Sequence, residues 1–215
     1  MNPRLIGWSL FVVFFSALAY AAQLSGEEPP KDFAYRWDSS ILGLVEYAIV
    51  FGVVMLLTLR LDRRRFLALR RPSSWWRGVR ISALVLFAVF VISGIVAQFG
   101  DAEKEQGLIP ESWDSHKVAQ FAAFAAVVTV VAPIVEELMF RGVGYALLEP
   151  FGQNLAVILV GIAFAYTHGL VVGFPVIATF GIGLAYLRSR TDSIYPCILL
   201  HASFNAAGLA YGVAG

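Results

Sequence analysis

Long runs of hydrophobic residues dominate the pattern of this chain. Five runs reach the length that a helix needs to cross a bilayer, roughly 17–25 residues, and they cover residues 5–22, 41–59, 81–99, 118–135 and 194–214. A further apolar stretch, 155–187, is interrupted only by His168 and by turns that contain Gly and Pro, so it has room for two short spans. The pattern predicts an all-α, polytopic transmembrane helical bundle with about seven spans.

The composition agrees with a membrane protein. Hydrophobic residues make up 59% of the 215 residues and charged residues 14%, and the net charge is +1. An ordinary soluble domain is about 45–50% apolar and about 25% charged. The single cysteine, Cys197, excludes an intrachain disulfide. We therefore expect a lipid bilayer as the surroundings of the chain, and no nucleic-acid partner.

Charged residues are distributed unevenly between the loops. The segment 60–80 contains eight arginines and one aspartate. The segment 100–117 is acidic instead, and its charged residues are Asp101, Glu103, Lys104, Glu105, Glu111, Asp114 and Lys117. The positive-inside rule places 60–80 in the cytoplasm, and seven spans with the N-terminus inside put Arg4, Arg188 and Arg190 on the same side. We expect an integral protein of a prokaryotic inner (cytoplasmic) membrane.

The first apolar run has two interpretations. It has a basic start, an apolar centre and small residues near positions 19–22, which is also the pattern of a cleaved signal peptide. Cleavage would leave six spans and the same orientation for the rest of the chain. Trp75 and Trp76, beside the arginines, suit an interfacial anchor or belong to a solvated basic loop.

Polar and ionisable side chains gather in the apolar runs of the second half of the chain. They form three sets, which are Glu136, Glu137 and Arg141; His168; and His201 with Asn205. An ionisable residue inside a span costs roughly 2.5–3.5 kcal/mol on insertion scales, so it suggests a function. Glu137 and Arg141 are one helical turn apart and can pair. Polar faces on three helices favour one shared interior site, because lipid offers no hydrogen bonds.

Several hydrolase motifs are missing from the chain. It has no H-E-x-x-H, no G-x-S-x-G and no aspartate within the apolar runs of the second half. The remaining chemistry is a carboxylate and an imidazole acting on water, together with donors that stabilise an oxyanion. This combination indicates hydrolysis of an amide bond.

Three short motifs carry a resemblance to a known family. "EELMFR" fits E-E-x-x-x-R, "FAYTH" fits F-x-x-x-H and "HASFN" fits H-x-x-x-N, in this order and on successive apolar segments. The chain thus resembles the CAAX-protease and bacteriocin-processing (CPBP, or Abi) family, whose eukaryotic relatives include the type II CAAX prenyl endopeptidase. The resemblance covers about residues 118–210. It implies a catalytic core over 118–215, transmembrane helices without a recognised motif over 1–117, and an all-helical bundle with an intramembrane cavity that contains the site.

The resemblance also implies roles for the catalytic residues. Glu136 would activate a water molecule with the assistance of His168, while His201 and Asn205 would form the oxyanion hole. The enzyme would be an intramembrane endopeptidase that cleaves a membrane-anchored or lipidated protein or peptide without a cofactor.

Three residues would support the catalytic set. Glu137 would be held by Arg141, and Phe164 would pack beside the histidine. The step of about 100° between adjacent helix positions means that Glu136 and Glu137 point in different directions, which fits this division of roles. An ordinary structural ion pair between Glu137 and Arg141 is the alternative interpretation. Glu46 is expected to be solvated near the end of its span.

Other functions stay open at the level of the sequence. A zinc-dependent protease of the same fold would use Glu137, His168 and His201 as ligands, since these are residue types that bind zinc. A non-catalytic membrane protein of this fold would act in immunity or as a chaperone-like factor. A transporter with a proton relay is a weaker alternative, because the first three apolar runs carry few charges.

Overall fold

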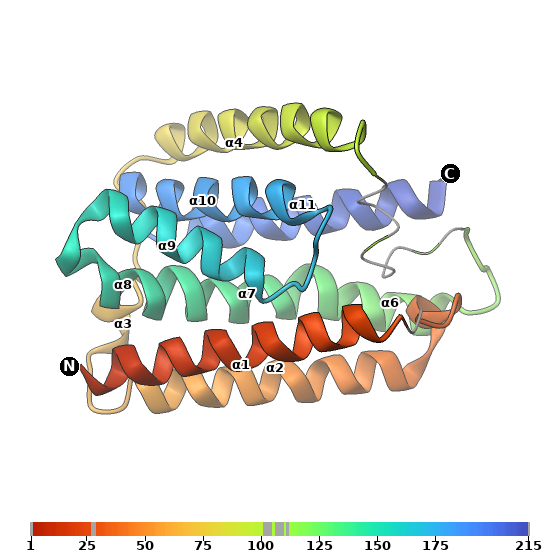
Figure 1. Cartoon of the computed structure of the whole chain (residues 1–215), viewed down its shortest axis with the longest axis horizontal. Helices are drawn as coiled ribbons and strands as arrows, with labels where there is room; N and C mark the ends of the chain where they lie inside the picture. Colours follow the sequence, from red (N-terminus) through yellow and green to blue (C-terminus); the bar gives the residue numbers. More distant parts are fainter. Residues whose placement is uncertain (1, 27–28, 101–104, 106–109, 111, 215) are drawn as a thin grey trace.

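The computed structural model of the chain describes residues 2–26, 29–100, 105, 110 and 112–214. Every regular element within these residues is helical, and the long helices run back and forth along one direction (Figure 1). Five helices are long and apolar enough to cross a membrane: α1 (Pro3–Ser25), α2 (Trp37–Leu57), α4 (Trp75–Val96), the continuous helix Val118–Phe151 and α11 (Tyr195–Ala214). The predicted all-α fold is therefore confirmed, and the five apolar helices suggest an integral membrane protein.

The apolar stretch 155–187 folds as a hairpin of two shorter helices, α9 (Gln153–Tyr166) and α10 (Phe174–Thr191). These two helices are packed closely against each other but are not among the five helices above. The count of seven spans thus stays a prediction. The remaining short elements are η1 (Phe33–Tyr35) and α3 (Arg63–Phe66).

The continuous helix Val118–Phe151 contains two π-helical segments. It consists of α6 (Val118–Ala126), the π-helical η2 (Val127–Val131), α7 (Ala132–Glu137), the π-helical η3 (Leu138–Gly144), α8 (Tyr145–Leu148) and the 3-10 turn η4 (Glu149–Phe151). Pro133 has no N–H for the preceding turn, and the Ala132 N–H reaches back five residues to the Val127 carbonyl. Wider turns of this kind often occur at functional sites, and here they lie on either side of α7.

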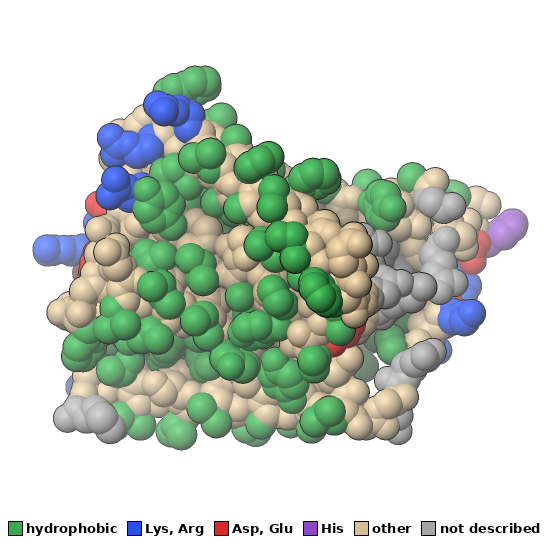
Figure 2. Space-filling view, turned by 45° about the horizontal axis from the view of Figure 1, so that its top comes forward, with side chains coloured by type: hydrophobic (Ala, Val, Ile, Leu, Met, Phe, Trp, Pro, Cys, Tyr) green, Lys and Arg blue, Asp and Glu red, His purple; other side chains and the backbone are tan. Residues whose placement is uncertain are grey.

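On the face that Figure 2 shows, charged side chains gather toward the two ends of the bundle, and the surface between them is mostly hydrophobic side chains and backbone. Arg4 donates to the carbonyls of Leu57 and Leu59, and Arg77 donates to the carbonyl of Arg190. These contacts bring the N-terminus, segment 60–80 and the end of α10 together, and we call this end the arginine-rich end. In the acidic segment, Asp101, Glu103, Lys104 and Glu111 lie outside the described residues.

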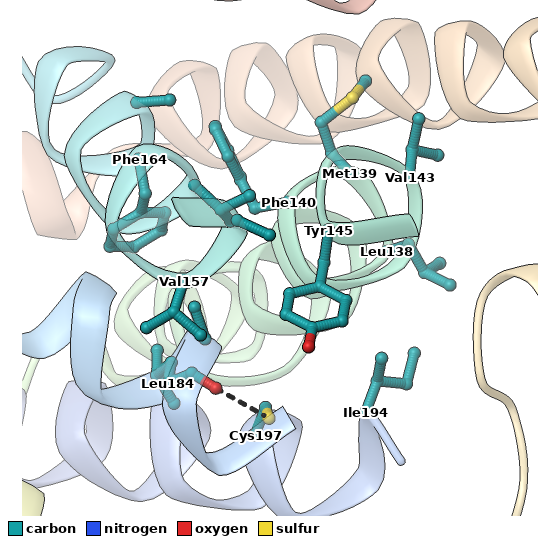
Figure 3. Packing of buried hydrophobic residues seen from close by; sticks show 14 of the residues in the cluster. Leu138, Met139, Phe140, Val143, Tyr145, Val157, Phe164, Leu184, Ile194 and Cys197 are labelled. Atoms are coloured by element: carbon teal, nitrogen blue, oxygen red, sulfur yellow. Dashed lines mark hydrogen bonds between the residues drawn. The ribbon is translucent and has the colours of Figure 1, made fainter. Parts of the chain in front are cut away.

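The core lies where α7, η3 and α8 pack against α9, α10 and α11 (Figure 3). Met139, Val143, Tyr145 and Leu184 are completely buried. The thiol of Cys197 is also buried and donates to the Leu184 carbonyl over 3.3 Å. Cys197 therefore links α11 to α10 as a small packing residue.

The first helix is integrated into this core. The Trp8 indole N–H donates to the Met139 carbonyl over 3.2 Å, and the Trp8 side chain is buried. Further along α1, the Tyr20 hydroxyl donates to the Leu170 carbonyl over 3.0 Å. We therefore propose that α1 is a permanent helix of the bundle, because these contacts tie it to the core; the alternative is a cleaved signal.

Two glycines allow α9 and α10 to approach each other closely. A Cβ atom on Gly161 would lie 2.4 Å from the backbone nitrogen of Ile182, and one on Gly181 would lie 2.6 Å from the Gly161 carbonyl oxygen. Backbone atoms cannot move aside as a flexible side chain can. The hairpin therefore requires glycine at both positions.

We predict that Gly161→Ala lowers the free energy of unfolding by about 1–3 kcal/mol, because the added methyl group overpacks the contact between α9 and α10. Gly94→Ala in α4 is the matched control, since a Cβ atom at Gly94 meets nothing within 4 Å. Thermal unfolding of the purified protein in detergent measures both. Equal unfolding temperatures for the two variants would show that the close approach is not required.

Candidate active site

Glu137, at the end of α7, is the most enclosed carboxylate of the site. Its side chain is fully buried. The Oε1 atom accepts a hydrogen bond from Nη1 of Arg141 over 3.0 Å and another from Nδ1 of His201 over 2.9 Å. One carboxylate oxygen thus joins the helix Val118–Phe151 to α11.

Arg141 is held on three sides. Besides its bond to Glu137, its Nη2 donates to the Gly181 carbonyl over 2.8 Å. Its guanidinium carbon lies 4.4 Å from the centre of the Phe164 ring. Because Gly181 belongs to the close contact between α9 and α10, the packing of the hairpin determines where the guanidinium group sits. The structure forms the predicted pair between Glu137 and Arg141 and buries it completely.

Glu136 differs from its neighbour in exposure and in partners. Its side chain is 16% exposed, whereas that of Glu137 is not exposed at all. The Oε1 atom accepts a hydrogen bond of 2.6 Å from the Tyr47 hydroxyl on α2. The Oε2 atom lies 3.7 Å from Nε2 of His201 and accepts no hydrogen bond from the part of the chain that is described. Glu136 therefore has one oxygen held by Tyr47 and a second, enclosed oxygen that has no hydrogen bond within the described residues and lies near the imidazole of His201.

His201 lies between the two glutamates. Since Nδ1 donates to Glu137, its Nε2 is the nitrogen that faces Glu136. The side chain is 4% exposed. This arrangement leaves Nε2 able to interact with a group that approaches Glu136.

His168 follows the end of α9, and its Nδ1 lies 2.8 Å from the Phe164 carbonyl oxygen. A carbonyl oxygen only accepts, so Nδ1 carries the proton, and Nε2 has no hydrogen bond to the described residues. The ring of His168 packs on the Phe164 ring at 4.5 Å between centres. The next residue, Gly169, has a positive φ of 68° and turns the chain away from the helix.

Phe164 is the contact that joins the predicted site residues. Its ring touches His168, lies 5.6 Å from the His201 ring and lies under the Arg141 guanidinium group. The structure thus brings these four residues together with Glu137. Glu136 completes the group through its approach to His201.

Asn205 is placed differently from the other predicted site residues. It follows His201 by one turn of α11, and its Nδ2 donates to the carbonyl of Val128 over 2.9 Å. Val128 belongs to the π-helical η2, so Asn205 ties α11 to the widened turn before α7. One amide hydrogen of Asn205 is committed to this bond.

Tyr47 is a residue of the site that the sequence did not reveal. A tyrosine in an apolar run is ordinary, because its ring is mostly hydrophobic. Nothing in the sequence around Tyr47 therefore marks it as a residue of the site.

The neighbouring Glu46 is placed differently from its expected position near the end of a span. The predicted apolar run begins at residue 41, but α2 begins at Trp37, so Glu46 lies near the middle of the helix.

The residues of the zinc alternative do not form a metal site. Within the described part of the chain, no three His, Cys, Asp or Glu side chains are grouped so that they could hold a metal ion. The Oε1 atom of Glu137 is occupied by Arg141 and by Nδ1 of His201. A guanidinium group beside the carboxylate also opposes a second cation. The geometry therefore gives no support to zinc bound by Glu137, His168 and His201.

The intramembrane cavity implied by the resemblance stays a prediction. Two cavities described in this structure, of about 690 and about 390 Å³, are lined by residues of the arginine-rich end. None of the candidate active-site residues lines either of them.

We predict that Arg141→Met lowers the free energy of unfolding by about 3–5 kcal/mol, because it leaves the buried Glu137 carboxylate without its cation. The double variant Glu137→Gln/Arg141→Met should recover a large part of this loss, since it removes both charges. Thermal unfolding of the two variants measures the difference. If the double variant is no more stable than Arg141→Met alone, the two residues do not act as a charge pair.

Comparison with known proteins gives one finding. Residues 118–207 match the family described as Type II CAAX prenyl endopeptidase Rce1-like. No curated protein and no solved structure matches the chain. The matched range contains all seven predicted site residues, and it includes α7, where the two glutamates lie. Membership of this family implies an intramembrane protease, and hence a peptidase with a protein substrate. Residues 118–207 therefore form a domain of the Rce1-like type II CAAX prenyl endopeptidase (CPBP) family.

Proposed function

We propose that the chain is an intramembrane endopeptidase in which Glu136 activates the attacking water. The observation that carries this proposal is the difference between the two glutamates. The Glu137 side chain is fully buried and its Oε1 accepts from both Arg141 and His201, whereas the Glu136 side chain is 16% exposed and its Oε1 accepts from the neutral hydroxyl of Tyr47. A general base needs a fixed carboxylate that a water molecule can approach, and of the two glutamate side chains only that of Glu136 is exposed.

The proposed reaction begins when Oε2 of Glu136 takes a proton from water. The resulting hydroxide attacks the carbonyl carbon of the scissile peptide bond and forms a tetrahedral intermediate. The proton then passes to the leaving amine nitrogen as the C–N bond breaks. His168 assists this proton transfer through its free Nε2 atom.

The negative charge of the intermediate needs donors close to the base. His201 donates from Nε2 when it is protonated, and the Glu137 carboxylate on its Nδ1 stabilises that cation. Asn205 contributes the amide hydrogen that is not bonded to Val128. Donors held in place before the reaction stabilise an oxyanion without further reorganisation.

The supporting residues keep this arrangement rigid. Arg141 fixes Glu137, and Glu137 fixes the imidazole of His201. Phe164 packs between the histidines and the guanidinium group. The proposed mechanism uses no metal ion, because the carboxylate itself acts as the base.

We propose a substrate that is a membrane-anchored or lipidated protein or peptide, consistent with a site built from transmembrane helices. The arginine-rich end would lie in the cytoplasm of a prokaryotic cell by the positive-inside rule. The N-terminus would then be inside as well, because Arg4 contacts the end of α2 at the same end of the bundle.

Glu136→Gln should abolish cleavage, because an amide cannot accept the proton from water. The amide oxygen can still accept from Tyr47, so the fold should persist. Quantitative mass spectrometry of the termini of membrane proteins, in cells with the wild-type protein or this variant, will identify any substrate as a protein that keeps its uncleaved terminus.

Glu149→Gln is the matched control for that comparison. It removes one exposed carboxylate at the arginine-rich end, beyond η3 and α8 from the two glutamates of α7. In cells with this variant, the termini of membrane proteins should match those in cells with the wild-type protein. Identical termini in all three strains, together with retained biological function in the Glu136→Gln strain, would contradict the proposal and favour a non-catalytic role.

Tyr47→Phe should reduce the turnover of the identified substrate by roughly 10-fold or more, because a hydrogen bond to a charged group contributes about 1.5–3 kcal/mol. The change keeps the ring and removes only the donor to Glu136. Initial rates at saturating substrate measure the effect, and thermal unfolding checks the fold. Wild-type turnover would show that Tyr47 does not position the base.

A further inference from the structure

A cavity of about 690 Å³ lies between α4 and α10 at the arginine-rich end. Three of the residues that line it are arginines, namely Arg77 and Arg80 on α4 and Arg190 on α10. All three side chains are exposed in the structure. The cavity contains none of the candidate active-site residues, so the proposed peptidase does not account for it.

The three arginines have no carboxylate partner within the described residues. The nearby Asp192 is engaged by Arg70 and Arg188. The backbone carbonyl of Arg190, at the end of α10, accepts a hydrogen bond from the Arg77 side chain. Three guanidinium groups on one cavity without a counter-charge produce a positive potential that attracts an anion.

The polarity of the cavity wall changes along the helix axis. Arg77, Arg80, Ile81 and Leu84 follow the spacing of one face of α4, so they form a continuous stripe. Leu84 lies about 10 Å deeper along the helix than Arg77, from a rise of about 1.5 Å per residue. On α10 the order is the same, with Arg190 at the end and Tyr186 one turn deeper. The cavity is thus basic at its mouth and apolar toward the middle of the bundle.

We propose that this cavity binds an anionic phospholipid. The phosphate group would lie among Arg77, Arg80 and Arg190, whose planar guanidinium groups suit phosphate oxygens. An acyl chain would lie along Ile81 and Leu84. Trp76, which is exposed and lines the cavity, lies at the level where tryptophan is common in membrane proteins. The deeper, apolar part of the cavity favours a lipid over a free phosphate ion, because a free ion would contact only the arginines at the mouth.

Native mass spectrometry of the purified full-length chain tests this site. The protein is titrated in detergent with phosphatidylglycerol, with phosphatidylcholine of the same acyl chains, and with glycerophosphoglycerol, which has the headgroup but no chains. The wild type should bind phosphatidylglycerol most tightly. In Arg77→Gln/Arg80→Gln/Arg190→Gln this binding should weaken by roughly tenfold or more.

The matched control is Arg60→Gln/Arg64→Gln/Arg71→Gln, which removes the same charge at the same end from arginines that line neither described cavity. It should bind phosphatidylglycerol like the wild type. An equal loss in both triple variants, no loss in either, or equally tight binding of glycerophosphoglycerol would overturn the proposal. Arg80→Gln alone, at an exposed position, covers the case in which the triple variant does not fold, and it should weaken binding several-fold.

Discussion

The rest of the site depends on one buried carboxylate, that of Glu137. A charge in the interior of a membrane bundle is tolerated only when its surroundings compensate it. Here a guanidinium group from the same helix and an imidazole from α11 share its Oε1 atom. This one oxygen determines which nitrogen of His201 faces Glu136. The two neighbouring glutamates therefore differ in their surroundings: Glu137 is bonded inside the bundle, and Glu136 is the one that we propose to act on water.

The helices supply this geometry through close packing and a change in winding. Gly161 and Gly181 allow α9 and α10 to touch, and the carbonyl of Gly181 then receives the Arg141 guanidinium group. The wider turns before and after α7 surround the segment that carries both glutamates. Asn205 bonds to the first of these turns. The positions of the site residues therefore depend on backbone features as much as on the residues themselves.

The sequence predicted the all-α fold with long apolar helices and most of the residues that the structure brings together around Glu137, because both follow from simple patterns. Long apolar runs have few structural alternatives, and charged residues inside them need one another. The turn spacing of Glu137 and Arg141 was sufficient to predict their pair. The contribution of Tyr47 was not predictable, since nothing local distinguishes a tyrosine that donates to a distant carboxylate from one that only packs. The wider turns and the bond from Asn205 to Val128 likewise depend on tertiary packing.

The central claim is that a glutamate, without a bound metal, activates the water. The most direct measurement is the cleavage rate of purified wild-type protein in lipid vesicles, with its identified substrate, after exhaustive treatment with a metal chelator and determination of the remaining metal. If Glu136 activates the water without a metal, the cleavage rate after chelation should equal the rate before it, with far less than one metal ion left per chain. A rate that is lost on chelation and restored by added zinc would contradict it.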